Sequence, residues 1–304
     1  MKTNIVLIIL MSILLSACDG DYMPVQNSHL VVEGWIEDDG YPTVIVTRSI
    51  PLFEHYVSAD SLSSYIVRWA KVTVYCDGDS VVLTGKYDSG YYPPYIYTTS
   101  GMRGEAGKTY SLKVEYKDMT ATAITTIPSR PDVQQFKLEK CQDSDTLYQA
   151  KVVFADNKSE KNYYQLFAKV GANNKQYLAS YLGSLDDAIL GDTTEIAIYR
   201  GHEVLSLMEY TPYFMPNDTL SVKLSHIDEV SYHFWDDYIK TLSNSKNPFM
   251  SPYKSIRSNI VNGAGYWCGM NSVKSYFIIP IYTPSFYRLY HILKIFEISL
   301  LHNL

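Results

Sequence analysis

The stretch TYSLKVEY, Thr109–Tyr116, shows the clearest alternation of apolar and polar side chains in the chain. Its even-numbered residues are apolar or aromatic and its odd-numbered residues are polar, so an extended strand here has one apolar face and one polar face. Lys117-Asp118 then turns the chain into a second run, rich in β-branched residues, at 119–127. Together the two runs predict a pair of half-buried antiparallel strands.

Shorter strands are predicted upstream of this pair. Runs rich in β-branched residues lie at 29–36, 43–49, 70–76 and 80–83. Turn-forming Asp and Gly residues separate them, and seven or so short strands over about 100 residues are typical of an immunoglobulin-like or related β-sandwich. The stretch PSRP at 128–131 cannot continue a strand ladder, so the first domain is expected to span residues 29–128.

The second half, residues 129–282, repeats the β character and adds one helix. Further strands are expected at 134–138, 148–154, 162–170, 195–199, 220–224 and 273–281. Asp228 has the side chain of an N-cap, and apolar residues recur every four positions after it, which predicts a helix at about 229–243. The apolar stripe consists of Val230, Phe234, Tyr238 and Leu242, widened by Trp235 and Ile239.

The expected fold class is therefore mainly β. It consists of two tandem β-sandwich domains, immunoglobulin-like or related, and the second domain carries one packed amphipathic helix. Packing of the apolar stripe onto a sheet is the favoured interpretation of that helix. A helix that forms a groove for a partner protein is the alternative.

The N-terminus is typical of a bacterial lipoprotein signal peptide. Its apolar run at 5–15 is too short to span a bilayer, which takes roughly 20 residues. The sequence Leu-Ser-Ala-Cys at 15–18 places a thiol where a diacylglycerol is attached before cleavage. We therefore expect residues 1–17 to be removed, Cys18 to be lipidated, and residues 18–28 to form a flexible tether.

The tail at 283–304 is atypical. Its apolar residues follow helical spacing, but charged residues interrupt the run, so it is not expected to span a membrane. An amphipathic docking helix and an appended piece lying loosely on the surface both fit this pattern.

The charge and the cysteine content argue against several classes of protein. The formal net charge is −6, and loss of the signal peptide with its one lysine makes the mature chain more negative by one charge. No long basic run is present, which argues against nucleic-acid binding. Besides Cys18 the chain has Cys76, Cys141 and Cys268, without a Cys-x-x-Cys motif, so at most one disulfide and no cysteine metal site are expected.

Candidate catalytic motifs fail on spacing or context. GKT at 107–109 lacks the glycine spacing of a P-loop, and a strand rather than a helix is predicted after it. GAGYWCG at 263–269 resembles a dinucleotide fingerprint with a displaced third glycine, and is predicted to form a tight bend. The seven histidines are scattered, and the acidic pairs at 38–39 and 186–187 are expected to be solvated loop acids. We therefore expect no catalytic residues, no metal ion and no cofactor.

Tyrosine is the most unusual feature of the composition, with 28 residues against 10 Phe and 4 Trp. A β-rich surface protein and an aromatic binding surface both explain the excess. In GYYPPYIY at 90–97, two prolines stiffen a segment that presents Tyr91, Tyr92, Tyr95 and Tyr97, which suits binding of a glycan or a peptide at small entropic cost. The alternative is that these tyrosines fold back onto the sandwich.

Both halves contain short segments whose order and spacing resemble those of a known family. These segments are LVVEGWI at 30–36, PTVIVTRS at 42–49, GKTY at 107–110, TIP at 126–128, NPF at 247–249, SNI at 258–260 and GAG at 263–265. The chain resembles the domain-of-unknown-function DUF4249 family of Gram-negative surface lipoproteins over about 30–281. It departs from the family in having YWC at 266–268, where members are Gly-rich and contain Phe, and in continuing beyond residue 283.

The resemblance implies an outer-membrane lipoprotein, on the periplasmic or cell-surface face, that partners a TonB-dependent β-barrel transporter. It transfers no established catalytic residues. The expected function is therefore that of a non-enzymatic binding or accessory protein, anchored in the membrane through a lipid on Cys18. A structural or adhesion protein of the fimbrial type is the alternative, and a glycan-active enzyme would need two loop carboxylates about 5–10 Å apart.

Overall fold

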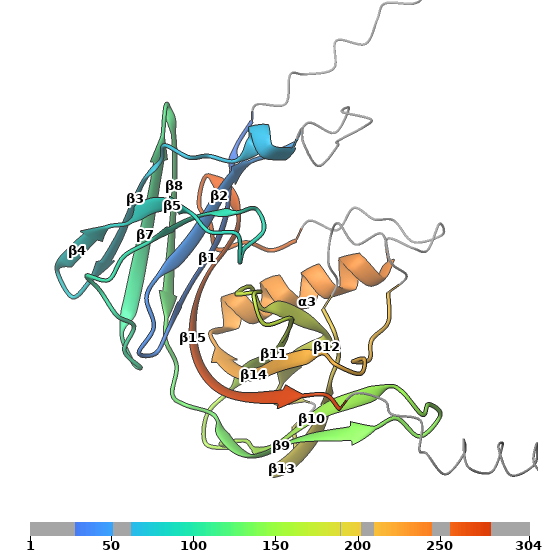
Figure 1. Ribbon diagram of the computed structural model, residues 1–304. Coiled ribbons are helices and arrows are strands. Elements are labelled where there is room, and N and C mark those ends of the chain that lie inside the picture. Colours follow the sequence, from blue (N-terminus) through green and yellow to red (C-terminus); the bar gives the residue numbers. More distant parts are fainter. Residues whose placement is uncertain (1–27, 51–61, 189, 202–209, 245–255, 281–304) are drawn as a thin grey trace, which may run out of the picture.

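The computed structural model describes residues 28–50, 62–188, 190–201, 210–244 and 256–280, whose arrangement is shown in Figure 1. In the N-terminal half the strands are β1 (Leu30–Glu37), β2 (Thr43–Arg48), β3 (Lys71–Cys76), β4 (Asp79–Val82), β5 (Thr84–Tyr87), β6 (Tyr95–Thr98), β7 (Thr109–Tyr116) and β8 (Met119–Thr126), with a 3-10 helix at Ser63–Tyr65. In the C-terminal half they are β9 (Asp132–Lys140), β10 (Tyr148–Ala155), β11 (Tyr163–Val170), β12 (Leu178–Asp186), β13 (Thr193–Ile198), β14 (Thr219–Ile227) and β15 (Gly263–Ile278), with helix α3 (Glu229–Asn244).

These strands form three sheets. The largest contains eight strands in the order β12-β11-β14-β15-β1-β2-β6-β5. A four-stranded sheet, β4-β3-β7-β8, packs against its N-terminal part, and a three-stranded sheet, β13-β10-β9, packs against its C-terminal part. Packing of sheet on sheet creates two sandwich cores. The fold is mainly β, with several sheets and one α-helix in the described part of the chain, which confirms the predicted fold class.

The first core lies between β1 and β2 on one side and β3, β7 and β8 on the other. In β7 the side chains of Tyr110, Leu112 and Val114 are buried, as the alternation in TYSLKVEY predicts. Trp267 of β15 is also fully buried here, and its indole N–H donates to the carbonyl oxygen of Tyr110 at 3.0 Å. A side chain from the C-terminal half therefore completes the core of the N-terminal half.

The second core lies between β9, β10 and β13 on one side and β11 and β14 on the other. Phe154 and Phe214 are fully buried in it, and the ring of Phe154 meets that of Tyr164 edge-on at 5.1 Å. Strands β5, β6 and β12 were not predicted. β5 and β6 are only four residues long, and an irregular register with β11 interrupts the alternation of β12.

Strand β15 joins the two halves, and Figure 1 shows it curving from one to the other. Its first part, from Gly263 to Met270, pairs in parallel with β1, and its second part, from Met270 to Ile278, pairs antiparallel with β14. The boundary predicted at 128–131 falls between β8 and β9, but the large sheet runs across it. The division into domains at 29–128 and 129–282 therefore stays a prediction about independent folding.

The segment GAGYWCG is the extended first part of β15, so the prediction of a tight bend is wrong. Gly265 has a φ of +104°, and a Cβ at this position would overlap the carbonyl oxygen of Val32 in β1. A Cβ at Gly34 would meet the indole ring of Trp267 at 2.8 Å. The glycines therefore let β1 and β15 approach each other closely instead of reversing the chain.

Helix α3 packs on the face of the large sheet opposite to the two cores. Asp228 caps it as predicted, since its Oδ1 accepts the backbone N–H of Ser231 at 2.8 Å. The helix packs onto the sheet, as expected, but the buried stripe differs from the predicted one. Val230 is 48% exposed, whereas Tyr232 is buried with its ring 4.9 Å from that of Tyr163, because the capped first turn directs Tyr232 toward β11.

Several predicted features lie outside the described residues. These are the signal peptide at 1–17, the lipidated Cys18 and most of the tether at 18–28, the NPF stretch at 247–249 and the tail at 283–304. None of the helices that the structure describes is long and apolar enough to cross a membrane. Lipidation at Cys18 and an outer-membrane location therefore remain predictions.

Candidate functional site

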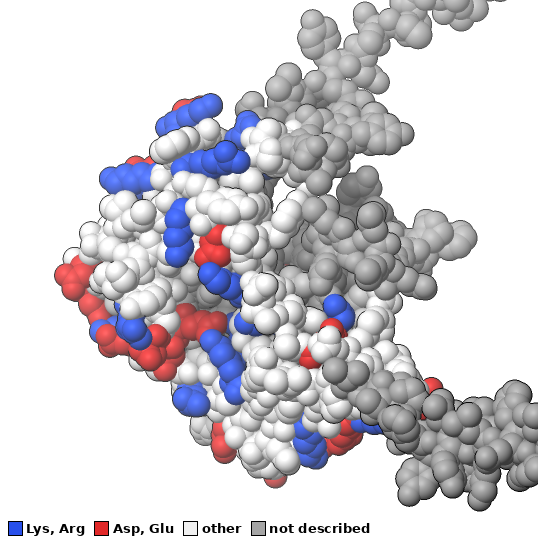
Figure 2. Space-filling view, in the orientation of Figure 1, with Lys and Arg blue, Asp and Glu red and all other residues white. Residues whose placement is uncertain are grey.

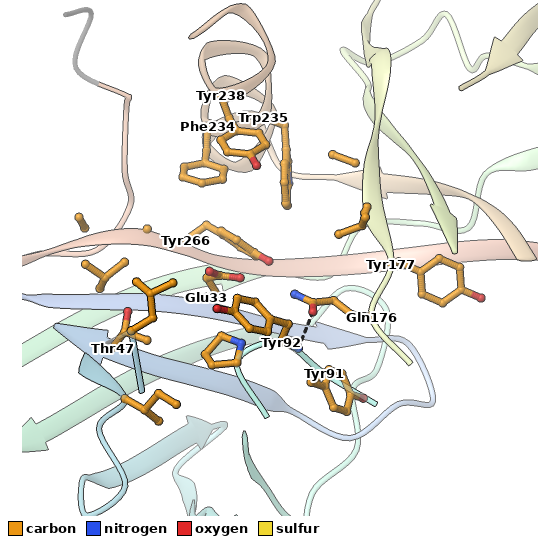
Figure 3. Close-up of a pocket in the computed structure, with 18 of the residues that line it drawn as sticks. Glu33, Thr47, Tyr91, Tyr92, Gln176, Tyr177, Phe234, Trp235, Tyr238 and Tyr266 are labelled. Atoms are coloured by element: carbon orange, nitrogen blue, oxygen red, sulfur yellow. Dashed lines mark hydrogen bonds between the residues drawn. The ribbon is translucent and has the colours of Figure 1, made fainter. Parts of the chain in front are cut away.

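A cavity of about 1000 Å³ lies between α3, the large sheet and two loops, and Figure 3 shows side chains that line it. Strands β1, β2, β12 and β15 contribute to it, together with the loop between β5 and β6 and the loop between β11 and β12. Both halves of the chain therefore build this site. Its aromatic lining residues are Tyr65, Tyr91, Tyr92, Tyr177, Tyr181, Phe234, Trp235, Tyr238 and Tyr266.

Three aromatic rings of α3 form one wall of the cavity. Phe234, Trp235 and Tyr238 project from the helix toward the sheet in Figure 3. Tyr266 of β15 lies at the sheet, and its ring centroid is 4.9 Å from that of Phe234 and 4.7 Å from that of Trp235. Helical spacing brings the three rings onto one side of α3, and contact with Tyr266 then fixes their positions.

Glu33 of β1 supplies the carboxylate of the cavity. Successive side chains of a strand point to opposite faces, so Val32 is buried in the first core while Glu33 lines the cavity beside its cross-strand neighbour Tyr266. The residues that the structure describes form no hydrogen bond or ion pair with this carboxylate. Burial raises the pKa of Glu33 from its ordinary value of 4.5 to about 7. The group therefore changes charge near neutral pH.

The loop between β5 and β6 forms another wall and carries two of the four tyrosines predicted to bind a ligand. Tyr91 and Tyr92 line the cavity, and the ring of Tyr91 lies 6.1 Å from that of Trp35. The backbone N–H of Tyr92 donates to Oε1 of Gln176 at 2.8 Å, which ties this loop to the loop before β12. A ligand-binding role for Tyr91 and Tyr92 stays a prediction, now attached to a defined cavity.

The other two predicted tyrosines do not line the cavity. Tyr97 is only 2% exposed, and its hydroxyl donates to the carbonyl oxygen of Val67 at 2.7 Å. The hydroxyl of Tyr95 donates to the carbonyl oxygen of Arg68 at 3.0 Å. Both belong to β6, where the strand geometry turns them back toward the first sandwich, as in the alternative interpretation of this stretch. Two of the four predicted tyrosines therefore line the cavity, and a ligand-binding role for any of the four stays a prediction.

Sequence reasoning did not identify Glu33 or Tyr266 as site residues. One signal was available, because Glu33 is the one charged residue in LVVEGWI, whose apolar residues occupy both faces of the strand. A carboxylate in a strand that is covered on both faces needs a partner or a cavity. Tyr266 offers no comparable signal, since its contact with α3 depends on the tertiary fold.

A charged cluster adjoins the cavity at Tyr177. The ammonium groups of Lys223 and Lys274 each lie 2.5 Å from the carboxylate of Glu37, and Lys223 also lies 4.7 Å from the centre of the Tyr177 ring. Burial acts to raise the pKa of Glu37, but the two ammonium groups outweigh it and lower the pKa to about 2. On the face shown in Figure 2, basic and acidic side chains likewise lie close to one another.

The remaining candidate groups have structural surroundings. Cys76, Cys141 and Cys268 are free thiols, and the described residues contain no group of three or more His, Cys, Asp or Glu that could hold a metal ion. The acidic pairs at 38–39 and 186–187 do not line the cavity. Asp38 accepts the backbone N–H of Ala106 at 2.9 Å, and other members of these pairs likewise bond to neighbouring loops and to α3.

The model of a family described as a domain of unknown function, DUF4249, matches residues 20–275, which include β1 and most of β15. A search of curated proteins finds no match to the chain.

Proposed function

Because the chain belongs to the DUF4249 family, we propose that it is a lipid-anchored outer-membrane protein with a non-enzymatic binding role. In this proposal Cys18 carries the lipid, the cavity holds a ligand, and the protein acts as the accessory partner of a TonB-dependent β-barrel transporter. The alternative is a structural or adhesion protein of the cell surface.

The observation that carries the binding role is the cavity itself. Its volume of about 1000 Å³ is in the upper part of the range for small-molecule sites. Aromatic rings line several sides of it, and a minority of polar lining residues, which includes Glu33, Arg48 and Gln176, is available to orient a ligand. Apolar walls with a small number of placed polar groups are typical of ligand-binding pockets.

The tether relates the cavity to the membrane. Residues 18–28 reach at most roughly 40 Å when fully extended. A lipid on Cys18 would therefore keep the protein, and the cavity that both halves of the chain build, close to the bilayer and to any transporter within it. This geometry supports a protein that receives a ligand from a membrane partner or delivers one to it.

Co-purification tests the partnership. The protein is expressed in its native host with a C-terminal tag, extracted in mild detergent and captured, with Cys18→Ala as the matched control. We expect a β-barrel transporter to co-purify with the lipidated protein and to be reduced with the variant. A solitary monomer from both preparations would contradict the partnership, and a ladder of regular oligomers would favour the structural alternative.

A further inference from the structure

The charged residues that line the cavity differ in whether other described residues contact their charged groups. Among the described lining residues only Glu33 and Arg48 carry charge. The guanidinium group of Arg48 donates to the carbonyl oxygen of Ser64 at 3.1 Å and lies 5.5 Å from the centre of the Tyr65 ring. Glu33 has neither a hydrogen bond nor an ion pair within the described part of the chain. Of the two charged lining residues that the structure describes, Glu33 is therefore the one without a partner among the described residues.

Aromatic rings surround this carboxylate. Tyr266 is its neighbour on β15. Burial raises the pKa of Tyr238 of α3, and the charge of the nearby Glu33 carboxylate raises it further. Phe234 and Trp235 pack on Tyr266, and Figure 3 shows Glu33 between this group and Tyr92. The faces of aromatic rings carry partial negative charge and attract cations. Rings around a carboxylate therefore favour an organic cation over an anion.

An unpaired carboxylate in such surroundings is costly, which is why the group holds its proton up to about neutral pH. A bound ammonium group would repay this cost, because it would take the place of the proton as counter-ion. The cavity is much larger than one ammonium group, and most of its lining is apolar or aromatic. The remaining space therefore suits an apolar body attached to the cation.

We propose that the ligand of this cavity is an amphipathic organic cation whose ammonium group is held by Glu33 and the surrounding rings of Tyr238, Trp235 and Tyr266. The inference rests on the proposed binding function and specifies the chemical class of its ligand. Binding at neutral pH or below then releases the proton of Glu33.

Three probes with the same eight-carbon chain test the inference. Octyltrimethylammonium, octyl glucoside and octanoate are titrated calorimetrically into the mature protein at pH 8, below their micelle concentrations. We expect the ammonium probe to bind about tenfold more tightly than the neutral one, as a desolvated cation–π contact with a counter-ion predicts. In Glu33→Gln this advantage is lost, whereas Glu115→Gln on β7, remote from the cavity, keeps it.

The pH dependence supplies a second readout that needs no variant. The other titratable groups of the described lining are the guanidinium group of Arg48 and the hydroxyls of the lining tyrosines, among which burial raises the pKa of Tyr91, Tyr238 and Tyr266. With Glu33 titrating at about 7, affinity for the ammonium probe should rise about tenfold from pH 6 to pH 8. The binding enthalpy should depend on the buffer, because a proton is released.

The outcomes separate this inference from the binding function. If octyl glucoside or octanoate binds as tightly as the ammonium probe, or if Glu33→Gln keeps the preference for the cation, the inference is wrong while a ligand-binding cavity stands. If none of the three probes binds at pH 6 or pH 8, both the inference and the binding role of the cavity are contradicted.

Discussion

The pKa values of two glutamates on the same face of β1 are shifted in opposite directions. Burial, with no partner among the described residues, raises the pKa of Glu33 to about 7, whereas the pKa of Glu37, which is partly exposed, is lowered to about 2 because its carboxylate lies between Lys223 and Lys274. The strand and the face are the same for both side chains, so only the neighbouring strands make the difference. The cross-strand neighbour of Glu33 in β15 is an aromatic residue, whereas the lysines that contact Glu37 come from β14 and β15.

Glu33→Gln should change how stability depends on pH. The folded protein keeps a proton on Glu33 between pH 4.5 and 7 that the unfolded chain releases, so its free energy of unfolding falls as the pH rises through this window. The full effect is about 3 kcal/mol. We expect the free energy of unfolding of the variant to exceed that of the parent protein by up to this amount at pH 8 and to equal it at pH 4. Urea unfolding at both values checks this, and an equal difference at both would contradict it.

Gly265→Ala should destabilise the protein severely. The substitution places a methyl group against the carbonyl oxygen of Val32 and forces alanine into a left-handed conformation. We expect a loss of at least ~2 kcal/mol, measured by thermal unfolding. Gly101→Ala is the matched control, because its added Cβ would meet only ordinary contacts at 3.4 Å. Equal melting temperatures for the two variants would show that β1 and β15 are not closely apposed here.

The start of helix α3 could be predicted from the sequence, whereas the residues that it buries could not all be predicted. Its beginning at Asp228 follows from the cap residue, since that signal acts through backbone groups within one turn. Its buried stripe is less predictable, because many residues on several sides of the helix are aromatic. Contact with β11 and β15 determines which of these residues face the sheet.

Asp228→Ala should loosen both the helix and its attachment. The carboxylate of Asp228 caps α3 by accepting the backbone N–H of Ser231, and it also accepts a hydrogen bond from the hydroxyl of Thr125 in β8 at 2.6 Å. We expect a loss of about 1–3 kcal/mol in the free energy of unfolding, from a lost cap and an unsatisfied hydroxyl. Lys240→Ala removes only the ion pair with Asp236 on the helix surface, so its expected cost is about 0.5 kcal/mol or less in the free energy of unfolding. Comparable losses in the two variants would contradict the capping role.

At the scale of the whole molecule, β15 makes the two halves depend on each other. It is the parallel partner of β1 and the antiparallel partner of β14, and it places Trp267 in the first core. The loops around the cavity are tied as well, since Lys175 pairs with Asp88 at 2.9 Å. The cavity is built where these connections meet, so its shape requires both halves.

A fragment of residues 29–128 should therefore fail to fold, although its length suits a β-sandwich. Without β15, β1 loses its pairing on one side and the first core loses its largest side chain. We expect poorly dispersed amide proton chemical shifts for the fragment, as in an unfolded chain. For the mature chain we expect one cooperative thermal transition. A well-dispersed spectrum from the fragment would instead establish 29–128 as an independent domain.

The sequence by itself determined the features that rest on local chemistry. The alternation in TYSLKVEY specifies β7, the turn at Lys117-Asp118 specifies its pairing with β8, and Asp228 specifies where α3 begins. Each of these signals acts between residues that are close in the chain. The family assignment also followed from short segments whose order can be read directly. Lipidation at Cys18 is a prediction of the same local kind.

Only the tertiary structure decided the cavity and the joining of the halves. The pairing of β1 with β15 connects residues far apart in sequence and leaves no periodic pattern in either segment. The same pairing places Glu33 beside Tyr266, where no described residue pairs with its charge, and this makes one acidic residue of an apolar strand a candidate binding group. Burial and neighbouring charge depend on every element that packs nearby, so the local sequence does not contain them.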